Sequence, residues 1–342
     1  MLFFIQIFII TLLLAIVLTF LVIKIAKILN IVDKPDQERK IHKKETPLLG
    51  GLAIFLTFFV ILYFFQDKLL AGNLEIKHWL GFFIGGIWLM IGGFLDDKYN
   101  FKPSYQIIFP FLAIISVICG GVEIEKITNP FGGIINLGYL SSILIALWLL
   151  GMIYTTKLLD GLDGLVSGVI AIGALIIFLF TITTKYYQPD ISLAALILSA
   201  SCFGFLFFNW HPAKIFLGEG GSLFLGYALG VLAIISGSKI AIALLIMGIP
   251  IIDVAWTIIR RIIANKNPFK FADKKHLHFR LLTLGLTVKQ TVFIYYGFAI
   301  IFGLSVLFLQ SKGKLYAFIA LLIIMFLIVT SLIYLDKKKK IV

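Results

Sequence analysis

Long apolar runs recur along the whole chain, and they limit what it can fold into. Each run has about 18 residues or more, enough to cross the ~30 Å hydrocarbon core of a bilayer as a helix. The chain has 342 residues, is 61% hydrophobic and has a mean hydropathy of +1.06. Only helices or closed barrels satisfy the backbone in lipid, and these runs are too continuous for barrel strands. The sequence therefore predicts an all-α polytopic membrane protein with a single integral domain over 1–342.

We expect about eleven transmembrane helices from the positions of the runs. They lie roughly at 2–26, 48–66, 78–95, 104–120, 139–157, 165–183, 191–208, 221–237, 239–259, 291–310 and 315–335. The first run is too long for the core of a signal peptide and lacks a small-residue cleavage site, so we expect it to stay as the first helix. Segment 121–138 combines β-branched residues with Pro130 and paired glycines, which predicts a short external hairpin.

Basic residues are distributed unevenly between the connecting segments. One set comprises 30–47, 96–103, 158–164, 209–220, 260–290 and the C-terminal tail. Together with Lys24, Lys27 and Lys157, this set holds 23 of the 30 Lys and Arg residues. Because cytoplasmic loops carry excess positive charge, we expect this set to be cytoplasmic and the N-terminus to lie outside the cell membrane. The net charge of +13 then indicates orientation and contact with anionic membrane lipids, and no nucleic-acid partner is expected.

Carboxylates gather at the ends of the expected spans, where charged side chains usually mark a site. Asp96 and Asp97 directly follow the third span. Two adjacent carboxylates at a membrane surface suit a divalent cation or proton transfer from a phosphate. An ordinary interfacial acid pair beside Lys98 is the simpler alternative.

A stronger signal is the run Asp160-Gly161-Leu162-Asp163-Gly164. Its aspartates are three residues apart and would share one face of a helical turn. Its glycines let the backbone approach a ligand closely. A helix–turn–helix corner capped by aspartates is the alternative, but two acids and two glycines in five residues favour a site.

The segment 209–222 offers groups for a nucleotide. Asn209 could hydrogen-bond a base, Phe216 could stack on one, and Glu219 could bind a metal. Gly220 to Ser222 open a span, and a helix N-terminus favours phosphate. For Phe216 taken alone, an interfacial aromatic anchor is the favoured interpretation.

Two further segments carry histidines among basic residues. His276 and His278 are spaced by two, which suits a strand or loop better than one helix face, and with Arg280 they offer donors for a pyrophosphate. A positive-inside loop would explain the Lys and Arg residues but not the paired histidines. In the first loop, the residues that could meet a lipid phosphate or a nucleotide are Arg39, Lys40 and His42.

In this order, the motifs resemble those of the polyprenyl-phosphate N-acetylhexosamine-1-phosphate transferases. That family includes undecaprenyl-phosphate N-acetylglucosamine-1-phosphate transferases and the phospho-MurNAc-pentapeptide translocase. The resemblance runs from Asp33 to about Gln290, and the Arg-Lys-x-His and His-Leu-His forms favour the N-acetylglucosamine branch. The matching pieces are Arg39-Lys40-Ile41-His42, Pro47-Leu48-Leu49-Gly50-Gly51, Leu95-Asp96-Asp97, Asp160-Gly161-Leu162-Asp163-Gly164-Leu165, Asn209 with Pro212-Ala213-Lys214-Ile215-Phe216, Gly218 to Gly226, Pro250-Ile251-Ile252-Asp253, and His276-Leu277-His278.

The resemblance implies transfer of N-acetylhexosamine-1-phosphate from a UDP-N-acetylhexosamine to polyprenyl (undecaprenyl) phosphate, with UMP release and Mg²⁺, at the start of cell-envelope glycan synthesis. The catalytic residues it implies are Asp96, Asp97, Asp160, His276 and His278. Substrate-binding residues would be Asp163, Gly161, Asn209, Phe216, Lys157, Arg39, Lys40, His42 and Arg280. The metal ligands would be Glu219 and Asp97.

Several positions depart from the family pattern, and Lys157 matters most. It stands where the family usually has a metal-binding asparagine, Glu219 replaces an aspartate, Phe279 replaces a histidine and Leu48 a common arginine. A unit charge at 4 Å and an effective dielectric of 20 interacts at ~4 kcal/mol, and a divalent ion would be repelled about twice as strongly. We therefore hypothesise that Lys157 pairs with Glu219 or the diphosphate, so that activity depends weakly on Mg²⁺; complete loss of turnover on chelation would reject this.

Two other functions compete with catalysis. A catalytically impaired member could bind nucleotide-sugar or lipid phosphate as a scaffold. A transporter would need polar groups at mid-span, and Asp253 is the main one here, either lining a kink at Pro250 or supporting a site residue. Gly226 and Gly230 could let two subunits approach as a homodimer, although packing within the chain is the favoured use.

Overall fold

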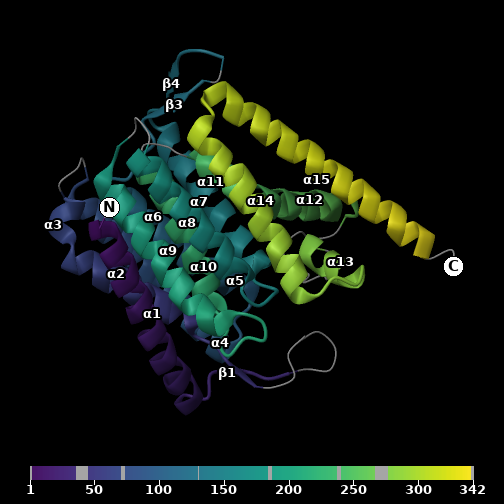
Figure 1. The fold of residues 1–342 in the computed structure, drawn as a ribbon, viewed down its shortest axis with the longest axis horizontal. Helices are drawn as coiled ribbons and strands as arrows, with labels where there is room; N and C mark the ends of the chain where they lie inside the picture. The colour runs from purple at the N-terminus through teal and green to yellow at the C-terminus, as the bar shows by residue number, and fades with distance from the viewer. Residues whose placement is uncertain are drawn as a thin grey trace.

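The computed structural model describes 2–35, 45–70, 74–129, 131–183, 187–236, 240–265 and 276–339, and almost all of its regular structure is helical (Figure 1). Its helices are α1 (Leu2–Ile28), α2 (Gly50–Phe64), α3 (Gln66–Leu69), α4 (Ile76–Tyr99), α5 (Pro103–Gln106), α6 (Ile108–Cys119), α7 (Leu140–Leu159), α8 (Leu165–Thr183), α9 (Pro189–Asn209), α10 (Gly218–Ile235), α11 (Ile240–Ile246), α12 (Gly248–Ile263), α13 (Leu277–Thr283), α14 (Val288–Phe308) and α15 (Ser311–Lys339).

The helices confirm a polytopic membrane protein. Within the described residues, eight helices are long and apolar enough to cross a bilayer, and a ninth crossing results if α11 and α12 count together. The expected spans at 48–66 and 104–120 correspond to α2 and to the stretch Pro103–Cys119, which are shorter apolar helices. All eleven predicted segments therefore contain helix, while the count of eleven crossings and the orientation stay predictions.

The expected span at 239–259 is not one continuous helix. α11 and α12 meet at Met247 and are bent by 79° relative to each other. Pro250 lies in the first turn of α12, where its missing N–H leaves no hydrogen bond unmade, so proline favours a helix start here. α12 also carries Asp253 and Arg261 on its buried side, which separates it from a uniformly apolar span.

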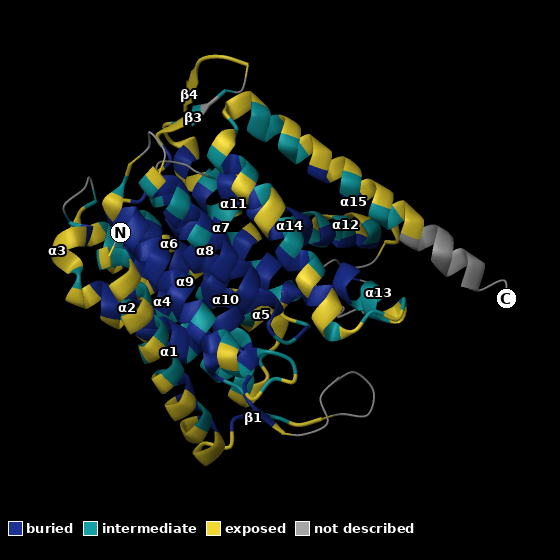
Figure 2. Ribbon diagram, viewed as in Figure 1, coloured by how far each residue is buried: buried dark blue, intermediate teal, exposed yellow. Residues whose placement is uncertain are grey.

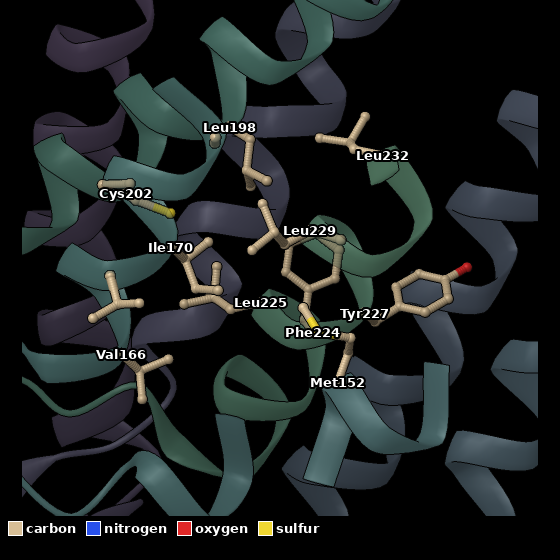
Figure 3. Close-up of a cluster of buried hydrophobic side chains, with 14 of the residues drawn as sticks. Met152, Val166, Ile170, Leu198, Cys202, Phe224, Leu225, Tyr227, Leu229 and Leu232 are labelled. Atoms are coloured by element: carbon tan, nitrogen blue, oxygen red, sulfur yellow. The ribbon is translucent and has the colours of Figure 1, made fainter. Parts of the chain in front are cut away.

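The centre of the bundle is formed by α8, α9 and α10. In the most apolar window of α10, 89% of the residues are buried, against 11% in α15. Figure 2 shows buried residues in the middle and exposed ones along the outer sides of α1 and α15. In Figure 3, side chains of α7, α8, α9 and α10 meet in this core, among them Met152, Ile170, Cys202 and Phe224.

Glycine pairs bring the start of α10 into contact with two other helices. A Cβ on Gly93 in α4 would lie 2.0 Å from Gly220 N, and one on Gly51 in α2 would lie 2.0 Å from Gly221 Cα. Only glycine, which has no Cβ, allows two helix backbones to approach this closely. Farther along α10, a Cβ on Gly226 would lie 2.2 Å from Thr156 Oγ1 in α7, so this glycine packs within the chain.

Two small antiparallel sheets complete the fold. Strands β3 (Lys126–Thr128) and β4 (Ile134–Asn136) pair Lys126 with Asn136, which confirms the predicted hairpin; its side of the membrane stays a prediction. Strands β1 (Val32–Asp33) and β2 (Thr46–Pro47) pair just before α2. The Phe216 N–H donates to Pro47 O at 2.9 Å, which ties this second sheet to the segment leading into α10.

Candidate functional site

Asp97 lies in the last turn of α4 and holds the start of α10. Both of its carboxylate oxygens accept the Glu219 N–H at 3.1 Å. Gly218 has a φ of +73°, and a Cβ there would lie 2.6 Å from Asp97 Oδ2, so glycine serves both the left-handed backbone and the close carboxylate. A carboxylate at this end also complements the helix dipole. Asp97 and Glu219, 122 residues apart in sequence, are thus neighbours in the fold.

Gln106 connects Asp96, the neighbour of Asp97 in the sequence, to Lys157. Asp96 accepts the Phe101 N–H at 2.8 Å, and Gln106 Nε2 donates to Asp96 Oδ1 at 3.0 Å. Gln106 Oε1 in turn accepts from Lys157 Nζ at 2.9 Å. Sequence reasoning missed Gln106. An amide at the start of an apolar span, ten residues after Asp96, is the signal that could have found it.

Lys157 and Glu219 form the central charge pair of the site. Lys157 lies in the last turn of α7 and Glu219 in the first turn of α10, and the ammonium contacts Glu219 Oε1. The contact is an ion pair without the angle of a hydrogen bond. Their side chains are 21% and 18% exposed, so both remain open to a ligand. The structure thus places Lys157 against one of the two partners that the sequence hypothesis named.

The Asp160–Gly164 run is a turn between α7 and α8 and not the helical turn that the sequence predicted. α7 ends at Leu159, and Gly164 has a φ of +76°, which only glycine adopts readily. Asp163 Oδ2 lies 2.6 Å from His211 Nδ1 and accepts the Ala213 N–H at 3.1 Å. The turn is therefore attached to the loop that follows α9.

Asp160 follows α7 directly, and solvent reaches it. Desolvation by the surrounding protein raises the pKa of the Asp160 carboxyl, and the charges of Glu219, Asp97 and Asp163 raise it further. All four causes act in the same direction. Within the described residues the Asp160 carboxylate accepts no hydrogen bond, unlike those of Asp97 and Asp163, so Asp160 is the carboxylate best placed to meet a ligand.

Asn209 is buried and holds two loops together. Its Oδ1 accepts the Gly164 N–H at 3.0 Å and the Ser167 hydroxyl at 2.9 Å, and its Nδ2 donates to Ile215 O at 2.9 Å. Contact of Asn209 with a base stays a prediction, because most of its hydrogen-bonding capacity is directed into the protein. Phe216 is partly buried at the end of the same loop.

The two histidines lie at the start of α13. His276 Nδ1 is 2.9 Å from Asp253 Oδ2, and Asp253 Oδ1 accepts the Leu277 N–H at 3.0 Å. The rings of His276 and His278 stack with centroids 5.7 Å apart. Asp253, the one polar group that stood out in the ninth span, therefore supports a predicted site residue. The spacing suggested a strand or loop, whereas His278 lies in the first turn of a helix.

His278 is fully buried against the Asp160–Gly164 turn. A Cβ on Gly161 would lie 2.6 Å from His278 Nε2. Among the described residues, neither ring nitrogen of His278 has a hydrogen-bond partner. Burial lowers the pKa of His278 to about 4, with a smaller lowering by His276 and an opposing effect of Asp253. Its ring is therefore neutral at pH 7.

The contacts above join most of the predicted site. Asp97 touches the start of α10, Glu219 touches Lys157, and Gly161 touches His278. Arg280 lies in α13, four residues after His276 and two after His278. Three predicted residues lie outside the described residues, namely Arg39, Lys40 and His42.

The predicted metal ligands do not fit a resident Mg²⁺ ion while Lys157 holds its place. Mg²⁺ requires several oxygen ligands in near-octahedral geometry. Glu219 Oε1 faces the Lys157 ammonium, and both oxygens of Asp97 accept a backbone N–H. In the part of the chain that the structure describes, no group of three or more His, Cys, Asp and Glu side chains is arranged to hold a metal ion.

Comparisons with known proteins identify the family. Residues 79–237 match glycosyl transferase family 4. A probable undecaprenyl-phosphate N-acetylglucosaminyl 1-phosphate transferase of Bacillus subtilis is 34% identical, covering 94% of this chain and 89% of the relative. An undecaprenyl-phosphate alpha-N-acetylglucosaminyl 1-phosphate transferase of Thermotoga maritima is 31% identical over 82% of both chains. A phospho-N-acetylmuramoyl-pentapeptide-transferase of Endomicrobium trichonymphae is 29% identical, covering 78% and 80%. The chain belongs to the polyprenyl-phosphate N-acetylhexosamine-1-phosphate transferases of glycosyl transferase family 4.

Proposed function

We propose that this chain transfers N-acetylglucosamine-1-phosphate from UDP-N-acetylglucosamine to polyprenyl phosphate in the cell membrane. The observation that carries the proposal is the convergence of the Asp97–Glu219 contact, the Asp160–Gly164 turn and His278 in a chain aligned over 94% of its length with a transferase of this kind. A scaffold that only binds these substrates is not favoured, because the relatives are named as transferases.

The reaction exchanges one phosphorus–oxygen bond for another. An oxygen of the lipid phosphate bonds to the phosphorus that carries the sugar. The bond from that phosphorus to the bridging oxygen of the diphosphate breaks, and UMP leaves with that oxygen. Catalysis of phosphoryl transfer consists mostly of positioning and of stabilising charge on the transferred group, so a site built of fixed charged groups is suited to it.

Asp160 is the proposed acceptor of a proton from the lipid phosphate. The raised pKa of its carboxyl brings it closer to neutral pH, where a general base works most efficiently. Asp96 and Asp97, whose oxygens accept hydrogen bonds from the protein, are proposed to position Gln106 and the start of α10 near the reacting phosphates.

The remaining predicted residues are proposed substrate contacts. Asp163, Asn209 and Phe216 would hold the uridine, with the loop after α9 supported by the bonds described above. His276, His278 and Arg280 would face the diphosphate. Residues of the first loop proposed to meet the lipid phosphate or the nucleotide are Arg39, Lys40 and His42.

Family resemblance also implies Mg²⁺, which when bound would neutralise charge on phosphoryl oxygens. The groups around Glu219 do not fit such an ion with Lys157 in place, so no step of the reaction is derived through it. A homodimer likewise stays a prediction.

The test is transfer by the purified protein. Radiolabelled UDP-N-acetylglucosamine and undecaprenyl phosphate are incubated with it in detergent, and labelled lipid and UMP are both quantified. We expect equal amounts of the two products, and a loss of about 10²-fold or more in Asp160→Asn, which removes the proposed base. Binding of the labelled donor without any labelled lipid would contradict the proposal and favour the scaffold.

A further inference from the structure

Lys157 is the site residue that the family pattern does not explain. Its ammonium contacts Glu219 Oε1 and donates to Gln106 Oε1 at 2.9 Å. We propose that this ammonium is a resident cation that binds the diphosphate of the donor directly, in place of a divalent ion at Glu219. The inference rests on the proposed function, because it assumes a donor with a diphosphate.

The ammonium is held from two sides by different helices. Glu219 lies in α10, and Gln106 lies in α5. The orientation of the Gln106 amide is fixed, because its Nε2 donates to both Asp96 oxygens, at 3.0 and 3.1 Å, which leaves Oε1 to accept from Lys157. A lysine held in this way acts as a fixed point charge, as lysines do on phosphates.

The ammonium keeps the capacity to bind a ligand. It has three N–H donors; one donates to Gln106, and the side of the ammonium toward Glu219 is taken up by the ion pair, which leaves a third N–H. The Lys157 side chain is 21% exposed, so a ligand can reach the third donor. An incoming diphosphate would also meet the carboxyl groups of Asp160 and Glu219, and the positive charge of Lys157 beside Glu219 favours its binding.

A divalent ion bonded to Glu219 Oε1 would have to displace this lysine. Lys157 contacts Glu219 Oε1, so a metal bonded to that oxygen would lie beside a like charge. Moving the ammonium away would also break its hydrogen bond with Gln106. We therefore expect metal binding through Glu219 to be weak in the native chain.

Donor binding tests the direct contact. Binding of UDP-N-acetylglucosamine and of uridine is measured by calorimetry in EDTA and in MgCl₂, with thermal melting to verify that each variant is folded. We expect the native chain to bind the donor in EDTA about as tightly as in MgCl₂. Lys157→Met should weaken donor binding about tenfold or more, the worth of a charge-assisted hydrogen bond, and leave uridine binding unchanged.

A double variant separates contact with the ligand from neutralisation of Glu219. In Lys157→Met with Glu219→Gln, both charges are absent, so repulsion of the diphosphate by an unpaired carboxylate is removed. Continued weak binding supports direct contact by the ammonium. Recovery of native donor affinity would overturn it, because Lys157 would then act only as the partner of Glu219.

Binding of Mn²⁺ without other ligands, monitored by electron paramagnetic resonance, tests whether Lys157 excludes a metal from Glu219. We expect no stoichiometric Mn²⁺ bound through Glu219 in the native chain, and a gained site in Lys157→Asn with Glu219→Asp. One Mn²⁺ per native chain that is lost in Glu219→Gln would overturn the inference, as would donor binding that EDTA abolishes. If the donor binds in EDTA but no lipid product forms with or without Mg²⁺, the proposed function fails and the inference about Lys157 stands.

Discussion

Gly161 lies where the Asp160–Gly164 turn meets α13, and an alanine there would force the two apart. A Cβ on Gly161 would lie 2.6 Å from His278 Nε2 and 2.9 Å from Phe279 Cζ. Side-chain Cβ atoms essentially never approach closer than 3.0 Å, so the His278 ring must withdraw by at least about 0.4 Å. The backbone of Gly161 does not have a positive φ, so alanine suits its conformation and the obstacle is its approach to these two rings.

The displacement cannot be absorbed by a simple rotation of the ring. His278 is fully buried and stacks on His276, which Asp253 holds at 2.9 Å. The shift should therefore move the start of α13. Overpacking of this kind costs about 1–3 kcal/mol. Because a misplacement of about 1 Å can lower turnover by about 10²-fold, we expect a loss of about tenfold or more here.

The assay is UMP release by Gly161→Ala, together with its thermal melting curve. Gly151→Ala is the matched control, because Gly151 lies in α7 with nothing within 4 Å of the added Cβ. It should keep native turnover and gain up to about 1 kcal/mol from its better helix propensity. Native turnover and melting in Gly161→Ala would refute the close contact between the turn and α13.

Three further results are expected. The pKa of His278 is about 4 in the folded chain against 6.5 in the unfolded one, so only the unfolded chain takes up this proton between those pH values. The free energy of unfolding should therefore fall by up to about 3 kcal/mol as the pH drops from 6.5 to 4. Melting curves of His278→Asn should lack this contribution. Gly93→Ala should cost about 3 kcal/mol or more, because its Cβ would lie 2.0 Å from the backbone of Gly220, and its melting temperature should fall below that of Gly161→Ala. Asp253→Ala removes the partner of His276 and should cost about 3 kcal/mol, with faster limited proteolysis near α13 than in the native chain.

The helices could be predicted from the sequence because lipid permits few alternatives. Hydropathy located helix in all eleven expected segments, but it could not predict the bend at Met247. Beyond the bend, Asp253 in α12 pairs with His276, which lies 23 residues farther along the chain. The length and composition of an apolar run do not predict contacts between distant residues. Pro250 was visible, but a proline alone does not distinguish a mild kink from two helices at 79°.

The motifs predicted which residues matter better than how they are arranged. Asp160 and Asp163 were expected on one helical face, yet a spacing of three is equally compatible with a turn, and Gly164 at positive φ decides for the turn. Comparison with the family pattern identified Lys157 as a departure and predicted Glu219 or the diphosphate as its partner. Gln106 as its second anchor could not be foreseen, because that contact joins residues 51 positions apart.

Backbone packing, more than side-chain choice, fixes the charge pair at the centre of the site. The first turn of α10 is pressed against α4 at Gly220 and against α2 at Gly221, and the Gly51 N–H donates to Leu217 O at 2.8 Å. Glu219 lies between these contacts, and its own N–H is held by Asp97. The helix start therefore cannot shift to draw Glu219 away from Lys157 without breaking contacts with two neighbouring helices. A metal could bond to Glu219 Oε1 only by moving the lysine, which is why substitution of Lys157 itself is the decisive experiment.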